Sequence, residues 1–289
     1  MQITAKNLSY TYSEKSKALS VNALDNVSLV IDEGSFFGVI GKTGSGKSTF
    51  IQHLNGLIKV GKNNGELTIG EYNLADKNCD LKSLRSKIGM VFQYPEHQLF
   101  AETVAEDVAF GLKNFEPDLT ESQVLERVQI ALDTVGLPYE EYGERSPFEL
   151  SGGQKRRVAI AGVIVTRPEI LVLDEPIAGL DPKGKKELTD ILKKMHADFV
   201  KTVIIVSHDM NFVAENCDKV AVFCDGKMLK SGTPKQVFSD EELVLSAGLE
   251  LPITAYLTKK YMEKGVILDN DFTVTSFVDA VAKLKGVSK

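Results

Sequence analysis

The stretch Gly41-Lys42-Thr43-Gly44-Ser45-Gly46-Lys47-Ser48 matches the pattern G-x-x-x-x-G-K-[ST]. A short apolar run at residues 36–40 precedes it, and apolar residues at helical spacing follow it within residues 50–57. Strand, loop and helix in this order are the context that a phosphate-binding loop requires. The glycines let the backbone curl so that its N–H groups point at phosphate oxygens, and the helix beginning near Lys47 directs its positive end at the same anion. The sequence therefore predicts nucleotide binding.

Two side chains of this loop have predicted roles. Lys47 is expected to reach the β- and γ-phosphates, and the Ser48 hydroxyl is expected to bind Mg²⁺. The alternative is a chance match, which occurs in roughly 1% of chains of this length. A nucleotide with Mg²⁺ is therefore the expected ligand of this loop. The expected nucleotide-binding residues of this segment are Gly41, Lys42, Thr43, Gly44, Ser45, Gly46, Lys47, Ser48 and Thr49.

Two carboxylates, Asp174 and Glu175, follow the apolar run at residues 170–173. In P-loop enzymes an aspartate at the end of a neighbouring strand holds Mg²⁺. Adjacent strand residues point to opposite faces, so the two carboxylates are expected to have different roles unless the strand ends there. We predict that Asp174 is a metal ligand and that Glu175 polarises the attacking water. The alternative, a strand end that merely turns at Pro176, is disfavoured by the phosphate-binding loop.

The hydrophobic pattern predicts an α/β fold. Continuous β-branched and aliphatic runs at residues 170–173 and 203–206 suit strands that are buried on both faces of a parallel sheet. From residue 121 to 135, apolar residues recur at helical spacing, and another helix is expected after Gly152-Gly153. We therefore expect an α/β core interrupted by a helical insert at about 94–165.

The two ends of the chain carry weaker patterns. Alternating residues from Ile3 to Tyr12 and the run at 27–31 predict two strands, separated by a polar loop from Ser13 to Ser20. A tail beginning at about residue 240 shows mixed helix and strand signals. Within it Phe277, Val281 and Leu284 form one apolar helical face. This face is expected either to pack on the chain's own core or to contact another subunit.

Composition excludes several classes of protein. The chain has 289 residues, 43% hydrophobic and 26% charged, which is ordinary for a globular protein of one or two domains. Its net charge of −6 argues against a nucleic-acid partner. No run is long and apolar enough to span a membrane, and the first residues do not resemble a secretory signal. Cys79, Cys217 and Cys224 show no CxxC spacing and are expected to be reduced thiols.

The segment Leu150-Ser151-Gly152-Gly153-Gln154 narrows the class. It resembles the signature motif of ATP-binding cassette (ABC) ATPases, although alone it could be a flexible linker or a helix N-cap. It lies upstream of Asp174 and opens a basic helix at Lys155-Arg156-Arg157. Four further elements resemble the family in the right order: the adenine-stacking aromatic Tyr12, the Q-loop glutamine Gln93, the D-loop Gly179-Leu180-Asp181 and the switch histidine His208. The match covers residues 3–232.

The resemblance implies a P-loop (RecA-like) ABC nucleotide-binding domain at residues 1–240, with a helical subdomain at about 94–165. Residues 241–289 would be a small C-terminal extension. It also implies that two cassettes close head-to-tail around two ATP molecules, so that each signature loop contacts the opposite subunit's nucleotide. The implied residues are Glu175, His208 and Gln93 for catalysis, Ser48, Gln93 and Asp174 for the metal, and Tyr12, Ser151, Gly152, Gly153, Gln154 and Asp181 for the nucleotide.

Residues 92–100, 146–149 and 52–57 look like those of energy-coupling factor (ECF) transporter ATPases. The loop at 13–22 and the Ser-Pro-Phe-Glu stretch at 146–149 resemble the second of the two ATPase subunits more than the first. The resemblance implies an ATP hydrolase that energises an importer for vitamins or other micronutrients, peripheral to the cytoplasmic face of the membrane. Its implied partners are a second homologous ATPase in a heterodimer, an integral membrane coupling subunit and a substrate-binding membrane subunit.

One position departs from the family pattern, since Ile177 stands where Thr or Ser is common after Asp-Glu-Pro. We expect little effect on the chemistry, because the backbone turn matters more than that side chain. The alternatives are the ATPase of a related cobalt or nickel importer and a soluble ABC ATPase acting on nucleic acid or ribosomes. The second usually has two cassettes or a long coiled coil. A small P-loop kinase should lack the segment at residues 150–154.

Overall fold

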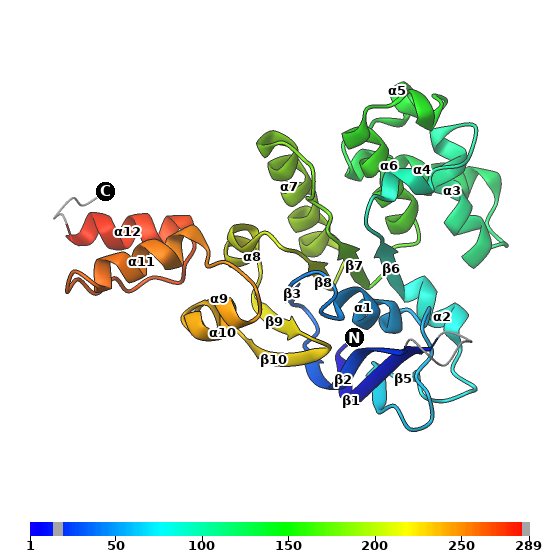
Figure 1. Cartoon of the computed structure of the whole chain (residues 1–289). Coiled ribbons are helices and arrows are strands. Elements are labelled where there is room, and N and C mark those ends of the chain that lie inside the picture. The colour runs from blue at the N-terminus through cyan, green and yellow to red at the C-terminus, as the bar shows by residue number, and fades with distance from the viewer. Residues whose placement is uncertain (14–19, 285–289) are drawn as a thin grey trace.

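The computed structural model describes residues 1–13 and 20–284, which form two sheets and the helices around them (Figure 1). Of the loop expected between Ser13 and Ser20, residues 14–19 lie outside the described part of the chain. The larger sheet has the strand order β10-β9-β3-β8-β7-β6. Its strands are β3 (Phe36–Ile40), β6 (Ile88–Val91), β7 (Ile170–Asp174), β8 (Thr202–Val206), β9 (Lys219–Cys224) and β10 (Lys227–Gly232).

All neighbours in this sheet are parallel except β9 and β10, which confirms the parallel core. The expectation that the acidic strand lies next to the strand of the phosphate-binding loop is wrong. The strand β8 lies between β3, which leads into the phosphate-binding loop, and β7, which ends in Asp174. The two still meet because parallel strands all end at one edge of the sheet.

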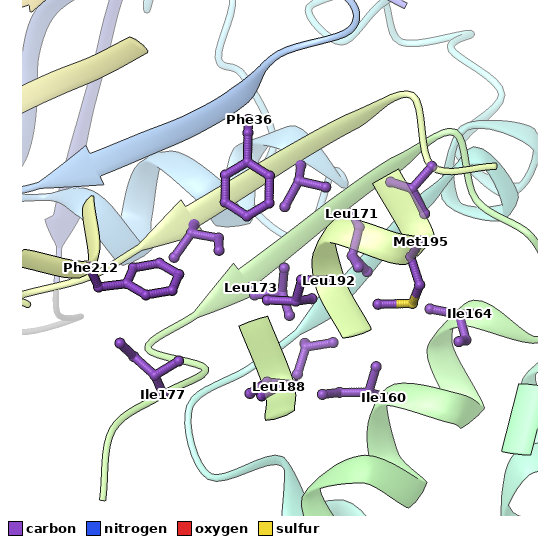
Figure 2. Close-up of a cluster of buried hydrophobic side chains, with 14 of the residues drawn as sticks. Phe36, Ile160, Ile164, Leu171, Leu173, Ile177, Leu188, Leu192, Met195 and Phe212 are labelled. Atoms are coloured by element: carbon purple, nitrogen blue, oxygen red, sulfur yellow. The ribbon is translucent and has the colours of Figure 1, made fainter. Parts of the chain in front are cut away.

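The continuous apolar strands are explained by burial on both faces. In β3, Phe36 and Ile40 belong to one hydrophobic cluster, whereas Phe37 and Val39 belong to the other. Figure 2 shows the first cluster, in which strand side chains pack against helices on one face of the sheet. The labelled members are Phe36, Ile160, Ile164, Leu171, Leu173, Ile177, Leu188, Leu192, Met195 and Phe212.

The second sheet is antiparallel, with the order β2-β1-β4-β5. It covers the helix that follows the phosphate-binding loop, and its apolar face packs on Phe50, Ile51 and Leu54 of that helix. Both expected N-terminal strands form, and the second is longer than residues 27–31. The strands are β1 (Ile3–Ser13), β2 (Ser20–Ile31), β4 (Glu66–Ile69) and β5 (Tyr72–Asn73).

Residues 94–165 form helices and turns between β6 and β7, beside the larger sheet (Figure 1). The segments are η1 (Pro95–Gln98), α3 (Val104–Phe115), α4 (Glu121–Thr134), α5 (Tyr139–Tyr142), η2 (Pro147–Glu149) and α6 (Gly152–Ile164). The helices that cover the sheet elsewhere are α1 (Lys47–Leu54), α2 (Leu81–Lys87), α7 (Pro182–Asp198) and α8 (Met210–Asn216).

The tail is helical, so the expected mixture of helix and strand is wrong for its described part. Its helices are α9 (Pro234–Phe238), α10 (Glu241–Ser246), α11 (Ile253–Met262) and α12 (Val274–Leu284). The apparent strand signal before α12 is a turn, in which Asp271 accepts the Thr273 N–H at 3.0 Å. The helix α12 has no buried residue, and it lies with α11 at one end of the molecule (Figure 1). Among the described helices, none has the length and apolarity to cross a membrane.

Candidate active site

A pocket of about 490 Å³ opens where β3, β7 and β8 end. It brings together residues from the phosphate-binding loop, the acidic strand, the Q-loop and the switch-histidine segment. Tyr12 reaches it from the antiparallel sheet. Its lining is Tyr12, Val21, Ala23, Thr43, Gly44, Gly46, Lys47, Ser48, Thr49, Gln93, Asp174, Glu175, Val206 and His208.

The phosphate-binding loop runs from the buried end of β3 to α1, which begins at Lys47 as expected. Lys47 Nζ donates to Gly41 O at 2.7 Å and to Lys42 O at 3.0 Å. Burial lowers the pKa of Lys47, and the nearby carboxylates of Glu175 and Asp174 oppose that shift. A buried ammonium held only by loop carbonyls and nearby carboxylates would gain from an anion beside it, so the loop fits a phosphate ligand.

Gly46 is one glycine of this loop that is expected to tolerate no side chain. Its φ is +102°, and a Cβ there would lie 2.4 Å from the backbone oxygen of Ala23 on β2. We expect Gly46→Ala to lower the free energy of unfolding by about 2–5 kcal/mol, the sum of left-handed backbone strain and overpacking. Gly44→Ala is the matched control, because Gly44 has φ +81° and, in the described part of the chain, no atom within 4 Å of a built Cβ. Urea unfolding should show a loss of only about 1–2 kcal/mol for the control, and equal losses would contradict the role of the Ala23 contact.

Ser48 and Asp174 lie together at the bottom of the pocket, where the Ser48 hydroxyl donates to Asp174 Oδ2 at 3.0 Å. Burial raises the pKa of Asp174, the Ser48 hydrogen bond opposes this, and the charge of Glu175 adds to it. A cation would relieve this crowding of buried carboxylates. In the described part of the chain, no group of three or more His, Cys, Asp or Glu side chains could hold a metal. A hydroxyl and one carboxylate fit Mg²⁺, which takes few protein ligands and completes its shell with water and substrate phosphates.

Glu175 differs from Asp174 because the strand ends between them. The strand β7 ends at Asp174, and Glu175 has φ +52°, with its N–H donating to Val206 O at 3.0 Å. Glu175 Oε2 lies 2.8 Å from His208 Nδ1, yet it is buried and accepts no hydrogen bond from any residue that the structure describes. The two groups therefore touch outside hydrogen-bonding geometry. This leaves an unsatisfied carboxylate oxygen, able to accept a proton, on the pocket wall.

The remaining pocket residues are arranged as follows. Tyr12 is 43% exposed, and its hydroxyl lies 3.3 Å from Thr49 Oγ1. Gln93 lines the same pocket as Ser48 and Asp174.

The signature segment and the D-loop lie outside this pocket. Ser151 is the N-cap of α6: its Oγ accepts the Gln154 N–H at 3.4 Å, and Gln154 Oε1 accepts the Ser151 N–H at 2.9 Å. Asp181 caps α7 by accepting the Gly184 N–H at 2.7 Å. Gly152 and Gly153 are exposed, with no atom near a built Cβ. The N-cap interpretation of Ser151 is therefore correct, and its hydroxyl hydrogen is not used in these bonds.

Sequence reasoning missed the role of Arg156, which is 6% exposed. Its Nη1 donates to Pro176 O at 3.0 Å and to Ala178 O at 2.8 Å, and its Nη2 lies 3.3 Å from Glu96 Oε1. Arg156 thus joins the signature helix to η1 and to the turn after Glu175. A signal was available, because residue 156 is four positions from Ile160 on the buried face of α6.

Comparisons with known proteins agree with this geometry. A family model described as "ABC transporter" matches residues 24–178. The ATP-binding cassette MJ0796, solved as a dimer bound to ADP and Pi, is 31% identical with a TM-score of 0.71, over 80% of this chain and 98% of that one. The cbiO1 protein of Clostridium perfringens, described as part of the ABC transporter complex cbiONQ, is 36% identical with a TM-score of 0.72, over 89% and 98%. The fold is therefore that of an ABC ATPase cassette.

Curated relatives narrow the class further. The energy-coupling factor transporter ATP-binding protein EcfA2 of Clostridium tetani is 46% identical over 95% of this chain and 94% of that protein. The EcfA2 protein of Clostridioides difficile is 47% identical over 94% and 93%. The chain belongs to the ECF transporter ATP-binding proteins of the EcfA2 group, which confirms the family and the second-subunit resemblance.

Proposed function

We propose that this chain binds and hydrolyses ATP to energise an ECF-type importer for vitamins or other micronutrients, by ATP-driven closure of an ATPase dimer. The single observation that carries the proposal is that the predicted ATP-binding residues lie in two separate places on the chain. The pocket holds the phosphate-binding loop, Asp174, Glu175 and His208. The signature segment at 151–154 and Asp181 lie elsewhere on the same chain. A second cassette would supply the missing half.

Within the pocket, the chain's own residues bind, orient and exchange protons. Lys47 and the loop N–H groups bind the phosphates, while Tyr12 stacks on the adenine. Ser48 and Asp174, with Gln93, would hold Mg²⁺. The ion would neutralise charge on the β- and γ-phosphates. The proposed nucleotide-binding residues on this side are Tyr12, Gly41, Lys42, Thr43, Gly44, Ser45, Gly46, Lys47, Ser48 and Thr49.

Glu175 is the proposed base for hydrolysis. Its Oε2 accepts a proton from the attacking water as the water oxygen bonds to the γ-phosphorus, the bond from that phosphorus to the bridging oxygen breaks, and ADP leaves with the bridging oxygen. His208, whose Nδ1 lies 2.8 Å from this oxygen, lines the same pocket and can contact the γ-phosphate. Gln93 completes the catalytic set.

Each subunit would contribute its signature segment to the ATP site of the other subunit. The Ser151 hydroxyl, the backbone N–H groups of Gly152 and Gly153, and Gln154 would face the γ-phosphate held by the second ATPase. Asp181 lies at the same boundary. Closure then depends on ATP, and hydrolysis weakens the contact.

We expect Lys47→Ala and Ser151→Ala to have different effects, because the two residues belong to different halves of the composite ATP site. In the isolated chain, Lys47→Ala should lower ATP affinity at least tenfold, because it removes a charge-assisted contact, whereas Ser151→Ala should leave the affinity unchanged. With the partner ATPase present, Ser151→Ala should lower kcat by about 10- to 100-fold through loss of a hydrogen bond to charged phosphate.

The matched control is Thr103→Ala, which removes the same kind of N-cap from α3 but is remote from the site. It should affect stability and not turnover. Calorimetric ATP titration and phosphate release measure the two effects. An isolated-chain affinity that falls with Ser151→Ala would contradict the division of the site between two subunits.

The proposed partners are a second homologous ATPase in a heterodimer, an integral membrane coupling subunit and a substrate-binding membrane subunit; no nucleic acid is involved. The chain would lie on the cytoplasmic face of the membrane. Two exposed aromatic rings, Phe100 and Phe110, contact each other at 4.9 Å beside the Q-loop, and they support a protein partner at this surface. The extension at 241–289 supports an ATPase–ATPase contact, because Val274, Val278 and Leu284 of α12 are exposed.

Affinity purification from detergent-solubilised membranes tests the assembly. Recovery of one further cassette with integral membrane proteins is the expected result, and a vitamin bound to the membrane fraction would identify the substrate class. Cobalt or nickel in that fraction would instead favour the related metal importer, the alternative suggested by the likeness to cbiO1. Recovery of ribosomes or a lone homodimer would contradict the proposal.

A further inference from the structure

A row of side chains connects Tyr12 to the interior of the molecule. Tyr12 and Tyr10 lie two residues apart on β1, and their rings meet edge to face, with centroids 4.8 Å apart and planes at 88°. The ring of Tyr10 in turn meets the imidazole of His53 at 5.1 Å and 79°. The exposed ring of Tyr12 is thus connected, through the ring of Tyr10, to the buried imidazole of His53.

His53 is fixed to the helix that carries the phosphate-binding side chains. It is 0% exposed on α1, and its Nδ1 lies 2.7 Å from Thr49 O, which assigns the ring hydrogen to Nδ1. Burial lowers the pKa of His53, so the imidazole is neutral. Its Nε2 is buried and has no hydrogen-bond partner among residues 1–13 and 20–284. An apolar side chain would avoid this unsatisfied atom, so packing alone does not explain a histidine here.

Tyr12 is attached to α1 at two points. Its hydroxyl contacts Thr49 Oγ1 at 3.3 Å, and its ring contacts the ring of Tyr10, which in turn contacts the His53 imidazole. The hydroxyl contact alone holds the tip of the ring and leaves its plane free to rotate. The edge-to-face contacts define that plane, because aromatic pairs prefer this geometry.

We infer that Tyr10 and His53 are positioning residues that set the plane of the Tyr12 ring for stacking on the nucleotide base. They contact neither phosphate nor base themselves. Because Thr49 and His53 follow Ser48 on the same helix, the base-binding ring and the phosphate-binding side chains share one rigid support. This inference rests on the proposed function, since it assigns Tyr12 to the base.

The test compares two ligands on the full-length chain by calorimetry: ATP, and inorganic tripolyphosphate, which has the phosphates but no base. For Tyr10→Leu and His53→Asn we expect the Kd for ATP to rise by about 2- to 13-fold, the contribution of an aromatic pair or of one immobilised side chain. The Kd for tripolyphosphate should stay unchanged. His53→Asn retains a donor to Thr49 O but removes the ring.

Conservative variants keep the test informative if Tyr10→Leu fails to fold. Tyr10→Phe and His53→Phe retain the rings and should bind ATP like the unsubstituted chain. Tyr261→Leu removes an aromatic pair with Phe277 far from the pocket and should change neither Kd. Equal losses for both ligands, or unchanged ATP affinity in His53→Asn, would overturn the inference. If the unsubstituted chain bound tripolyphosphate no more weakly than ATP, the base-stacking role of Tyr12 in the proposed function would fail instead.

Discussion

Replacing Glu175 with glutamine is expected to lower kcat for ATP hydrolysis by about 10²- to 10⁴-fold, the range associated with a lost general base. Glutamine has the same shape but cannot accept a proton at neutral pH. In Glu175, the Oε2 atom is buried, accepts no hydrogen bond from the described residues and lies 2.8 Å from His208 Nδ1. ATP should still bind because Lys47 and Ser48 are unchanged. Together with its partner ATPase, the variant should therefore accumulate in the closed, ATP-bound dimer.

Phosphate release at saturating ATP and Mg²⁺ gives kcat, and size-exclusion chromatography detects the dimer. The matched control is Glu169→Gln, at the opposite end of β7, where Glu169 pairs with Lys201 at 3.1 Å. It makes the same chemical change at the residue just before the same strand but should leave kcat unaltered. Normal turnover in Glu175→Gln would remove this residue from its proposed role.

Arg156→Met is expected to destabilise the fold by about 3–5 kcal/mol, the range measured when one partner of a buried ion pair is removed. The substitution leaves the largely buried Glu96 carboxylate without its cation, and Pro176 O and Ala178 O without their donor. Urea unfolding of the purified chain measures the loss. Because Pro176 follows Glu175 directly, the same substitution should also lower kcat in the assembled dimer.

Two further variants test whether the loss of the buried ion pair causes this destabilisation. Arg145→Met breaks an exposed pair with Glu141, separated by 3.6 Å, and should cost at most about 1 kcal/mol. The double variant Arg156→Met with Glu96→Gln removes the stranded carboxylate and should recover part of the loss. If Arg156→Met were no more harmful than Arg145→Met, the buried pair would not stabilise this junction.

The strands of the core could be predicted from the sequence because each hydrophobic pattern has one physical cause. Residues 170–173 and 203–206 are apolar throughout since both faces of their strands are covered. The order of the strands was not readable, because hydrophobic periodicity describes one segment and not its neighbour. The place of β8 between β3 and β7 depends on its pairing with β3, across more than 160 residues.

The site was predictable where a motif requires special backbone, as at Gly46, or two carboxylates at the end of an apolar run. It was not predictable where a residue acts through contacts made only in the folded chain. Arg156 looked like one member of a basic helix, and His53 like part of a helical pattern. Their significance lies in what surrounds them, Pro176 O for Arg156 and the ring of Tyr10 for His53.

The central position of β3 has a consequence for synthesis of the protein. All five residues of β3 are buried, but its two neighbours, β8 and β9, are completed only about 180 residues later, at Cys224. At ribosomal rates of about 5–20 residues per second, the nascent chain exposes this apolar strand for roughly 10–40 s. The antiparallel sheet can assemble early from nearby segments, whereas the parallel sheet must wait. We therefore expect the emerging polypeptide to need chaperone protection until β9 has left the ribosome.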